Sequence, residues 1–217
     1  MKKNISVMLM IFAFLFAVQA AAEVKIPDDA LETASKTDQF ILVRYTDASN
    51  ADFRMYEKND GGEWLEVIST SAYIGKNGMG KTREGDAKTP VGEFHFTMAF
   101  GRKDDPGCPI GYRKVDETDY WCGDSNSPLY NQFVSTRNYN NFNKDDSEHI
   151  IDYNPQYNYA LNISYNEDGT PGKGSAIFLH CQGLKKYTGG CVSVTEEVMK
   201  NILKRVHKNC LILIKDK

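Results

Sequence analysis

Short apolar or alternating runs, separated by turn-forming residues, recur along most of the chain. Runs of about four to eight residues that are rich in β-branched and aromatic side chains predict strands. The predicted strands lie at 39–46, 51–58, 63–70, 93–100, 148–154, 159–166, 175–180 and 210–215. This pattern predicts a mainly β chain with a few helices.

One hairpin and one helix are marked clearly. The stretch "NDGG" at 59–62 joins two of these runs and is typical of a β-hairpin, so the first three strands are predicted to form a meander. After Ser193 the apolar side chains fall on one face of a helix, at Val198, Met199, Ile202, Leu203 and Val206. Ser193 with Glu196 fits a capping box, and Thr195 is the alternative N-cap.

The N-terminal residues have the features of a secretory signal peptide. Two lysines precede an apolar run at 5–18, and small residues follow in "AVQAAAEV". The run is short for a membrane span, so an uncleaved anchor is the weaker alternative. We expect residues 1–22 to be a signal peptide cleaved after Ala20 or Ala22, which leaves an exported protein without stable membrane insertion.

Residues 23–217 are long enough for one well-buried domain and short for two. Loss of Lys2 and Lys3 changes the formal charge from −3 to −5, because 29 acidic residues then face 24 basic ones (26 less 2). The sequence has no basic run interleaved with aromatics of the kind that binds phosphates. We therefore expect a single exported domain that does not bind nucleic acid.

Five cysteines in an exported chain leave at least one thiol free or bonded to another molecule. Cys108 and Cys122 bracket "CPIGYRKVDETDYWC", a loop of turn formers and aromatics, and we predict a disulfide between them. Closing a loop of this length stabilises a protein by roughly 3 kcal/mol. Cys181 could pair with Cys210 if their strands are neighbours, which leaves Cys191.

Residues 101–147 form a long insert rich in Asp, Asn, Gly, Pro and Tyr, without sustained periodicity. An irregular segment of this length in a compact domain is usually functional or disordered. Its aromatic residues favour an ordered loop that walls a cleft, and local packing over the sheet is the equal alternative. These aromatics are Tyr112, Tyr120, Trp121, Tyr130 and Tyr139.

The segment "IFLHCQGLKKYTGGCVSV" at 177–194 brings His180, Cys181 and Cys191 close to a Gly-Gly pair. A structural zinc site usually has four ligands in close pairs, and no second pair follows here. A disulfide at Cys191 is the stronger structural alternative, because cysteines of exported proteins are usually bonded. The third interpretation is a cysteine nucleophile with a histidine base.

Cys191 has the sequence context of a reactive thiol. It follows Gly189 and Gly190 and precedes a predicted helix start, where backbone N–H groups and the helix dipole would lower the thiol pKa. His180 ends a predicted strand and is the candidate base. The N–H groups of Cys191 and a neighbouring glycine are candidates for an oxyanion hole. This chemistry requires no metal.

Two stretches resemble the catalytic domain of the L,D-transpeptidase (YkuD-like) family. In the first, ten residues separate the histidine of "FLH" from the cysteine of "TGGC", which is similar to the family's motif of His, Ser or Thr, Gly and Cys. In the second, "GKTREGDAKTPVGEFHF" at 80–96 resembles an upstream signature in which Gly-Asp and Thr-Pro-x-Gly lead into a strand. The resemblance covers roughly residues 39–215 and implies the family's β-sandwich catalytic fold.

The resemblance also implies which residues are catalytic. His180 and Cys191 match the family's catalytic pair, and Thr188 and Gly190 match its Ser/Thr and Gly positions. The best-known members have a longer His-to-Cys interval and a histidine in place of Gly189.

The substrate-binding residues of the family are not carried over. Val192 and Ser193 stand where the best-known members have Arg-Asn-like residues that help to position substrate. Besides Thr188, the candidates for this role come from their loop context: Trp121, Tyr130, Asn131 and Tyr153.

The resemblance further implies acyl transfer on peptidoglycan stem peptides, without a cofactor, in cell-wall biogenesis and cell shape. Cys191 would attack the carbonyl of an L-centre before a terminal D-amino acid and form a thioester, with His180 relaying protons. An amine of a neighbouring stem would resolve the thioester as a cross-link in the periplasm or cell-wall space. The alternatives are an L,D-carboxypeptidase or amidase with the same dyad, and a non-catalytic wall-binding or inhibitory protein.

Overall fold

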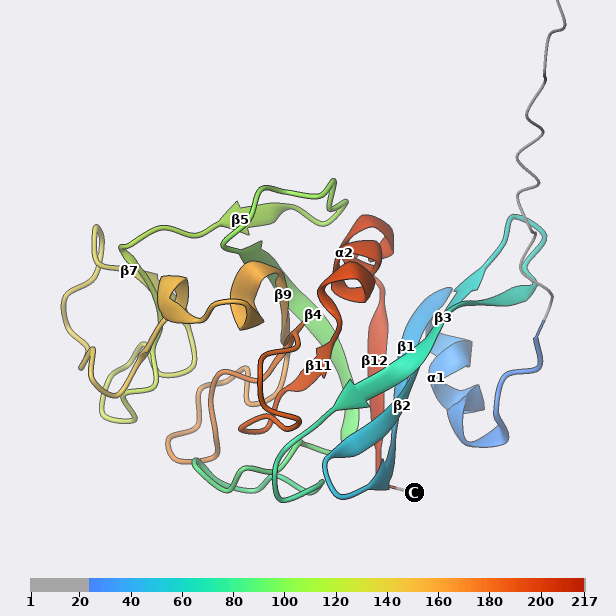
Figure 1. Cartoon of the computed structure of the whole chain (residues 1–217), viewed down its shortest axis with the longest axis horizontal. Helices are drawn as coiled ribbons and strands as arrows, with labels where there is room; N and C mark the ends of the chain where they lie inside the picture. The colour runs from blue at the N-terminus through green and yellow to red at the C-terminus, as the bar shows by residue number, and fades with distance from the viewer. Residues whose placement is uncertain (1–23, 217) are drawn as a thin grey trace, which may run out of the picture.

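The structure, a computed structural model, describes residues 24–216, and the predicted signal peptide lies outside the described residues. Over these described residues the chain is mainly β, as predicted, with the two α-helices α1 and α2 (Figure 1). The helical elements are η1 (Asp28–Ala30), α1 (Leu31–Lys36), η2 (Ile150–Asp152), η3 (Gln156–Asn158) and α2 (Glu196–Arg205). The strands are β1 (Gln39–Asp47), β2 (Asn50–Lys58), β3 (Trp64–Tyr73), β4 (Gly92–Gly101), β5 (Tyr112–Lys114), β6 (Asp119–Trp121), β7 (Phe133–Ser135), β8 (Glu148–His149), β9 (Ala160–Ile163), β10 (Phe178–Cys181), β11 (Val192–Val194) and β12 (Leu211–Lys215).

A nine-stranded sheet in the order β12-β1-β2-β3-β11-β10-β9-β4-β5 forms the body of the protein. Strand β12 also pairs with β4, so every strand of this sheet except β5 belongs to a closed ring. The predicted meander of β1, β2 and β3 is confirmed by their antiparallel pairing. Strands β10 and β11 are parallel neighbours, so the connection between them crosses back and sets the two short strands side by side.

The first strand shows why these residues form a sheet that is buried on both faces. Ile41 and Val43 point into the main hydrophobic cluster, whereas Phe40 and Leu42 belong to a second cluster with Ala30 of η1. Successive side chains of a strand alternate between faces, so this run of four apolar residues covers both sides. Helix α1, which was not predicted, contributes Ala34 to the second cluster.

Helix α2 is the predicted helix. Thr195 is its N-cap, because its hydroxyl accepts a hydrogen bond from the Val198 N–H at 3.3 Å. The face that was predicted to be apolar buries Met199, Ile202 and Leu203 in the main cluster, beside residues of β10 and β11. The helix thus packs against β10, which carries His180, and against β11, which directly follows Cys191.

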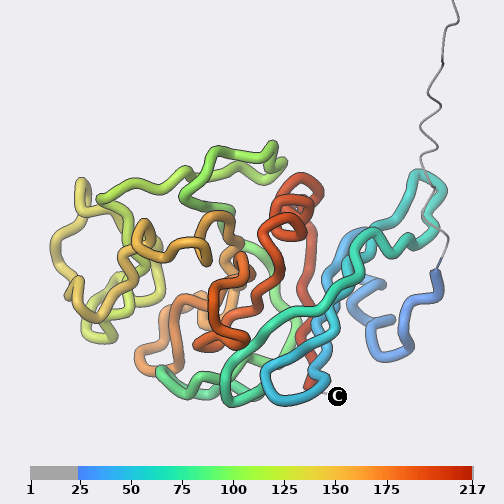
Figure 2. The backbone as a smooth tube through the Cα atoms, in the orientation of Figure 1, coloured from blue at the N-terminus to red at the C-terminus, as the bar shows by residue number. Residues whose placement is uncertain are grey.

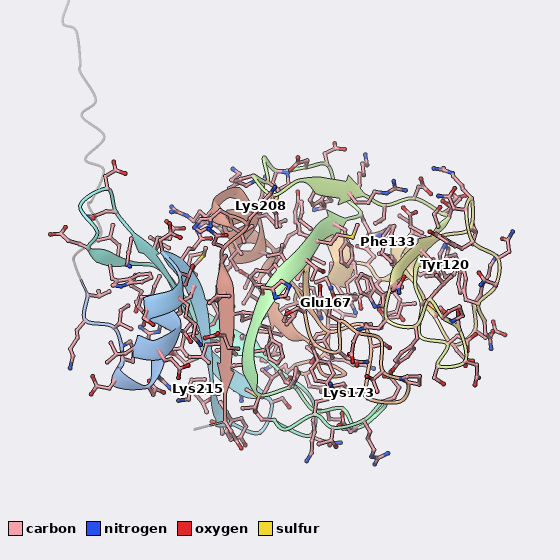
Figure 3. All side chains as sticks on the ribbon, turned by 180° about the vertical axis from the view of Figure 1, so that it is seen from behind. Tyr120, Phe133, Glu167, Lys173, Lys208 and Lys215 are labelled. Atoms are coloured by element: carbon pink, nitrogen blue, oxygen red, sulfur yellow. The ribbon has the colours of Figure 1, made fainter. Side chains whose placement is uncertain are left out.

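The insert at 101–147 is ordered and lies at the opposite end of the molecule from α1 (Figure 2). Strands β6 and β7 within it join β8 in a small three-stranded antiparallel sheet. Seen from behind, Tyr120 and Phe133 lie on this sheet, far from Lys215 at the end of β12 (Figure 3). The predicted strand at 148–154 is wrong beyond β8, because residues 150–152 turn into η2 and bury Ile150.

The predicted disulfide between Cys108 and Cys122 is not formed, and all five cysteines are buried free thiols. Cys108 packs in the main cluster of the large sheet. Cys122 follows β6 and exchanges backbone hydrogen bonds with Asn131 and Gln132 in the small sheet. The alternative pair of Cys181 and Cys210 also fails, because β10 and β12 are not neighbours in the sheet.

Within residues 24–216, no helix has both the length and the apolar character needed to cross a bilayer.

Candidate active site

Cys191 and His180 lie on neighbouring segments that end at one cleft. His180 is on β10, and Cys191 directly precedes β11, whose parallel pairing sets Leu179 opposite Val192 and His180 opposite Ser193. Both side chains line a cleft of about 760 Å³. The sheet register thus brings together two residues that the sequence only suggested as partners.

The Cys191 thiol is held by two hydrogen bonds and is 7% exposed. Its Sγ donates to the Ala176 carbonyl at 3.2 Å and accepts from the Phe178 N–H at 3.3 Å. Burial raises its pKa to about 12, and the charge of Glu148 adds to this increase. The predicted lowering of the thiol pKa is therefore wrong for the free protein, because β11 separates Cys191 from the start of α2 and burial dominates.

His180 is buried and neutral. Its Nδ1 lies 2.7 Å from the Cys181 carbonyl oxygen, which can only accept, so Nδ1 carries the proton and Nε2 is the free base. Burial lowers the His180 pKa to about 4, and the ring of Tyr157 packs edge-on against the imidazole at 5.5 Å between centroids. Among the described residues no hydrogen bond joins His180 to Cys191, and such bonds often shorten only when substrate is bound.

The turn before Cys191 is fixed by two threonines. The Thr188 hydroxyl donates to the Cys191 carbonyl at 2.6 Å and accepts from the Gly190 N–H at 3.1 Å. The Thr89 hydroxyl lies 3.3 Å from the same carbonyl. Thr188 therefore holds the nucleophile's backbone, in addition to lining the cleft.

Gly190 is required by the shape of this turn. Its φ is +145°, and a Cβ would lie 2.8 Å from the Lys88 carbonyl oxygen. Its N–H is engaged by Thr188, so it is not available to the predicted oxyanion hole. The Cys191 N–H remains a candidate donor for the oxyanion hole.

Of the substrate-binding candidates outside this turn, Trp121 and Tyr153 line the cleft, whereas Tyr130 and Asn131 do not. Trp121 is nearly buried and donates from its indole to the Asn131 side-chain carbonyl at 2.9 Å. The same Asn131 oxygen accepts from the Ala176 N–H at 3.0 Å. Because the Ala176 carbonyl accepts the Cys191 S–H, Asn131 supports the nucleophile through Ala176.

Two glutamates that sequence analysis did not identify also line the cleft, and each accepts a hydrogen bond from a tyrosine. The Tyr157 hydroxyl donates to Glu148, and the Tyr130 hydroxyl donates to Glu84, each at 2.5 Å. Burial raises the Glu148 pKa to about 7. Glu84 lies inside the upstream motif but is not one of the positions by which the motif is recognised, and Glu148 lies outside both motifs.

The upstream motif folds into a loop that places a cation in the cleft wall. Lys81 pairs with Asp86 at 3.0 Å, and both side chains are almost fully buried. Asp86 also accepts backbone hydrogen bonds from Thr82, Arg83 and Lys88, and these with Lys81 lower its pKa to about 2 against the effect of burial. The positive charge of Lys81 partly offsets the rise in the Cys191 pKa.

Within residues 24–216, no group of three or more His, Cys, Asp or Glu side chains is arranged to hold a metal ion.

Comparison with solved structures finds a cell shape determining protein and several L,D-transpeptidases. The Campylobacter jejuni helical cell shape determining protein Pgp2 is 18% identical, with 82% of this chain and 48% of that chain covered and a TM-score of 0.44. A mutant Enterococcus faecium L,D-transpeptidase is 15% identical (82% and 50% covered, TM-score 0.37), and Mycobacterium tuberculosis L,D-transpeptidase 1 is 12% identical (82% and 61% covered, TM-score 0.37). The chain thus spans about half to three fifths of the length of these proteins.

A search of curated proteins gives no match. The family model of the YkuD L,D-transpeptidase catalytic domain matches residues 38–214, which include the whole large sheet except the end of β12 and contain both catalytic candidates. The chain therefore belongs to the YkuD family of L,D-transpeptidase catalytic domains.

Proposed function

We propose that the protein is an exported cysteine acyltransferase that acts on peptidoglycan stem peptides through a thioester on Cys191. The YkuD family acts on peptidoglycan peptides, which supports this class of substrate. The observation that carries the proposal is the pair of residues at one cleft: a buried thiol on one parallel segment and, on the next, an imidazole with its Nε2 free.

The first half-reaction releases the terminal D-amino acid of the donor. His180 Nε2 takes the thiol proton as Cys191 Sγ attacks the carbonyl carbon of the L-centre. The tetrahedral intermediate collapses, the carbon–nitrogen bond breaks, and His180 returns the proton to the leaving amine. The Cys181 carbonyl stabilises the imidazolium that forms between these transfers, because it accepts from Nδ1.

The second half-reaction transfers the acyl group to an amine of a neighbouring stem. The neutral amine attacks the thioester carbon, His180 takes a proton from the attacking nitrogen, and the proton then passes to the leaving Cys191 sulfur. The products are a new amide cross-link and the free thiol. The Cys191 N–H would donate to the oxyanion in both halves.

The second candidate function shares the first half-reaction and differs in the acceptor. An L,D-carboxypeptidase or amidase would resolve the thioester with water. The exposed rim of the cleft favours this candidate, because Lys76, Lys185 and Gly189 are solvent-exposed and water can approach the site past them.

The test is the product ratio from one donor stem peptide with increasing amounts of an amine acceptor. Transfer predicts a cross-linked product that grows with acceptor concentration at the expense of hydrolysis. If only hydrolysed product forms at saturating acceptor, the protein is a carboxypeptidase and the assignment as a transpeptidase is rejected. Retention of full activity in Cys191→Ala would reject both functions.

Export is a separate proposal, based on the predicted signal peptide at 1–22. Fractionation of cells that produce the full chain should recover a shortened protein from the periplasm or cell-wall space. Full-length protein confined to the cytoplasm would contradict export without affecting the assignment of Cys191.

A further inference from the structure

Two lysines on one rim of the cleft share a single aromatic ring. Lys76 lies in the turn after β3, and Lys185 lies in the segment between β10 and β11. Their Nζ atoms are 5.6 Å and 5.7 Å from the centroid of the Tyr187 ring. All three residues line the same cleft as Cys191.

The charge of this rim is not neutralised by the protein. Within residues 24–216, neither the Lys76 nor the Lys185 ammonium makes a hydrogen bond or an ion pair. The third lysine of the cleft, Lys81, differs because it is paired with Asp86. A ring face attracts an ammonium but leaves its N–H donors available for a ligand.

This rim is attached directly to the turn that carries the nucleophile. The Lys76 N–H donates to the Thr188 carbonyl at 3.0 Å, and the Thr188 N–H donates to the Ile74 carbonyl at 2.8 Å. The Thr188 hydroxyl in turn holds the Cys191 carbonyl. These bonds hold the backbone of Lys76 beside that of Cys191, so an anion bound at the Lys76 ammonium would lie near the turn that carries the nucleophile.

Two glutamates of the cleft favour one orientation of a bound peptide, with its carboxylate at the lysines. Glu84 and Glu148 line it as well, and within the described residues neither makes an ion pair. A ligand carboxylate is repelled by these glutamates and attracted by the lysines. The cleft therefore distinguishes the two directions in which a charged peptide could lie.

We propose that Lys76, Lys185 and Tyr187 form a carboxylate-binding subsite that orients the donor peptide beside Cys191. The inference rests on the proposed function for the identity of that donor. Two ammonium groups can share one carboxylate through charge-assisted hydrogen bonds. The carboxylate is either that of the terminal D-amino acid or another along the stem, and amidated peptides distinguish these two sources.

The test measures binding without turnover. A synthetic stem tetrapeptide that ends in a D-amino acid is titrated by calorimetry into Cys191→Ala protein and into the same protein with Lys76→Ala and Lys185→Ala. The loss of both lysines should weaken binding about tenfold, and the loss should shrink as sodium chloride increases. Lys186→Ala is the matched control, because Lys186 is an exposed neighbour that does not line the cleft, and it should leave the Kd unchanged.

Two amidated peptides identify the contact. One has a carboxamide at its terminus, and the other has carboxamides at its remaining carboxylates. The peptide that lacks the recognised carboxylate should bind the lysine-containing protein more weakly than the unmodified peptide does. Its Kd should be the same for the proteins with and without the two lysines. An equal Kd for the proteins with and without the lysines, or an equal loss with every amidated peptide, would overturn the subsite.

Covalent adduct formation by protein with Cys191 intact tests the proposed function separately. Carboxylate-dependent binding without an adduct would reject acyl transfer and keep the subsite. An adduct together with lysine-independent binding would reject the subsite alone. Lys76→Gln with Lys185→Gln repeats the comparison with longer neutral side chains, so an effect of lost packing is recognised.

Discussion

Burial opposes the ionisation of both Cys191 and His180, because it raises the thiol pKa to about 12 and lowers the imidazole pKa to about 4. The free protein therefore holds a neutral thiol beside a neutral base at pH 7. Proton transfer to His180 must accompany the attack of Cys191 on the substrate. The carboxylate of Glu148 contributes to this state by raising the thiol pKa.

Glu148→Gln should make Cys191 more reactive. Removal of the negative charge lowers the thiol pKa, so alkylation by iodoacetamide should become several-fold faster at pH 8, because one pKa unit corresponds to about tenfold in thiolate. The difference should grow above pH 7, where Glu148 is ionised in the unmodified protein. Glu167→Gln, which removes an exposed carboxylate beside His95, is the control. An unchanged alkylation profile would contradict the role of Glu148.

The neutral state of His180 also predicts how stability depends on pH. Its folded pKa is below the ordinary 6.5, so between pH 6.5 and about 4 the unfolded chain takes up a proton that the folded protein does not. Stability must therefore fall as pH falls through this range, by about 2 kcal/mol at pH 5 from this residue. Between pH 7 and pH 5, the free energy of unfolding measured in urea should therefore decrease by about 2 kcal/mol less in His180→Asn than in the unmodified protein. Equal losses in both proteins would show that His180 is protonated when folded.

At the scale of the elements, the loop at 81–90 depends on Asp86. This carboxylate accepts three backbone N–H groups and pairs with the buried Lys81. Asp86→Asn should lower the free energy of unfolding by about 3 kcal/mol or more, because it leaves a buried ammonium without its counter-charge. Urea denaturation at pH 7 measures the loss. Adding Lys81→Met should recover part of it, and a double variant less stable than Asp86→Asn would contradict this explanation.

The longer elements could be predicted because their patterns are periodic. β1, β2, β4, β12 and the apolar face of α2 are long enough to show alternation or helical spacing. Strand β11 has three residues, all buried, so it shows no alternation and was not predicted. Strands β5, β6 and β7 were not predicted because three residues are too few to show a periodic pattern.

The catalytic candidates could be predicted from the motif, but most of their surroundings could not. Thr89 and Glu84 lie in the upstream motif and Glu148 lies in β8, but only the fold shows that Thr89 contacts the Cys191 carbonyl and that both glutamates line the cleft. The disulfide was predicted from the loop of turn formers and aromatics that Cys108 and Cys122 bracket. That pattern does not reveal that Cys108 packs in the main hydrophobic cluster, whereas Cys122 lies beside the small sheet.

At the scale of the whole molecule, the insert supplies one wall of the cleft. Trp121, Gly123, Ser125 and Asp146 line it from the insert, whereas Lys185 and Tyr187 line it from the segment between β10 and β11. We therefore expect the insert to limit the access of water to the thioester. An amine acceptor would then compete better than water.

Replacement of the exposed segment 136–146 by a short Gly-Ser linker should therefore raise the ratio of hydrolysed to cross-linked product. The ratio is measured with one donor and varied amine acceptor, at matched rates of Cys191 acylation. Cys108→Ser with Cys122→Ser should leave the ratio unchanged, because the structure has no disulfide between them. An unchanged ratio of hydrolysed to cross-linked product in the loop variant would show that this segment does not limit the access of water.

The most direct test of the central claim is intact-protein mass spectrometry after mixing with a donor stem peptide. The unmodified protein should gain the mass of the donor less its terminal D-amino acid, and peptide mapping should place that mass on Cys191. Cys191→Ala should gain none, and His180→Ala should acylate about 10²–10⁴-fold more slowly. An adduct on another residue, or release of the D-amino acid at an undiminished rate by Cys191→Ala, would contradict the assignment of Cys191 as the nucleophile.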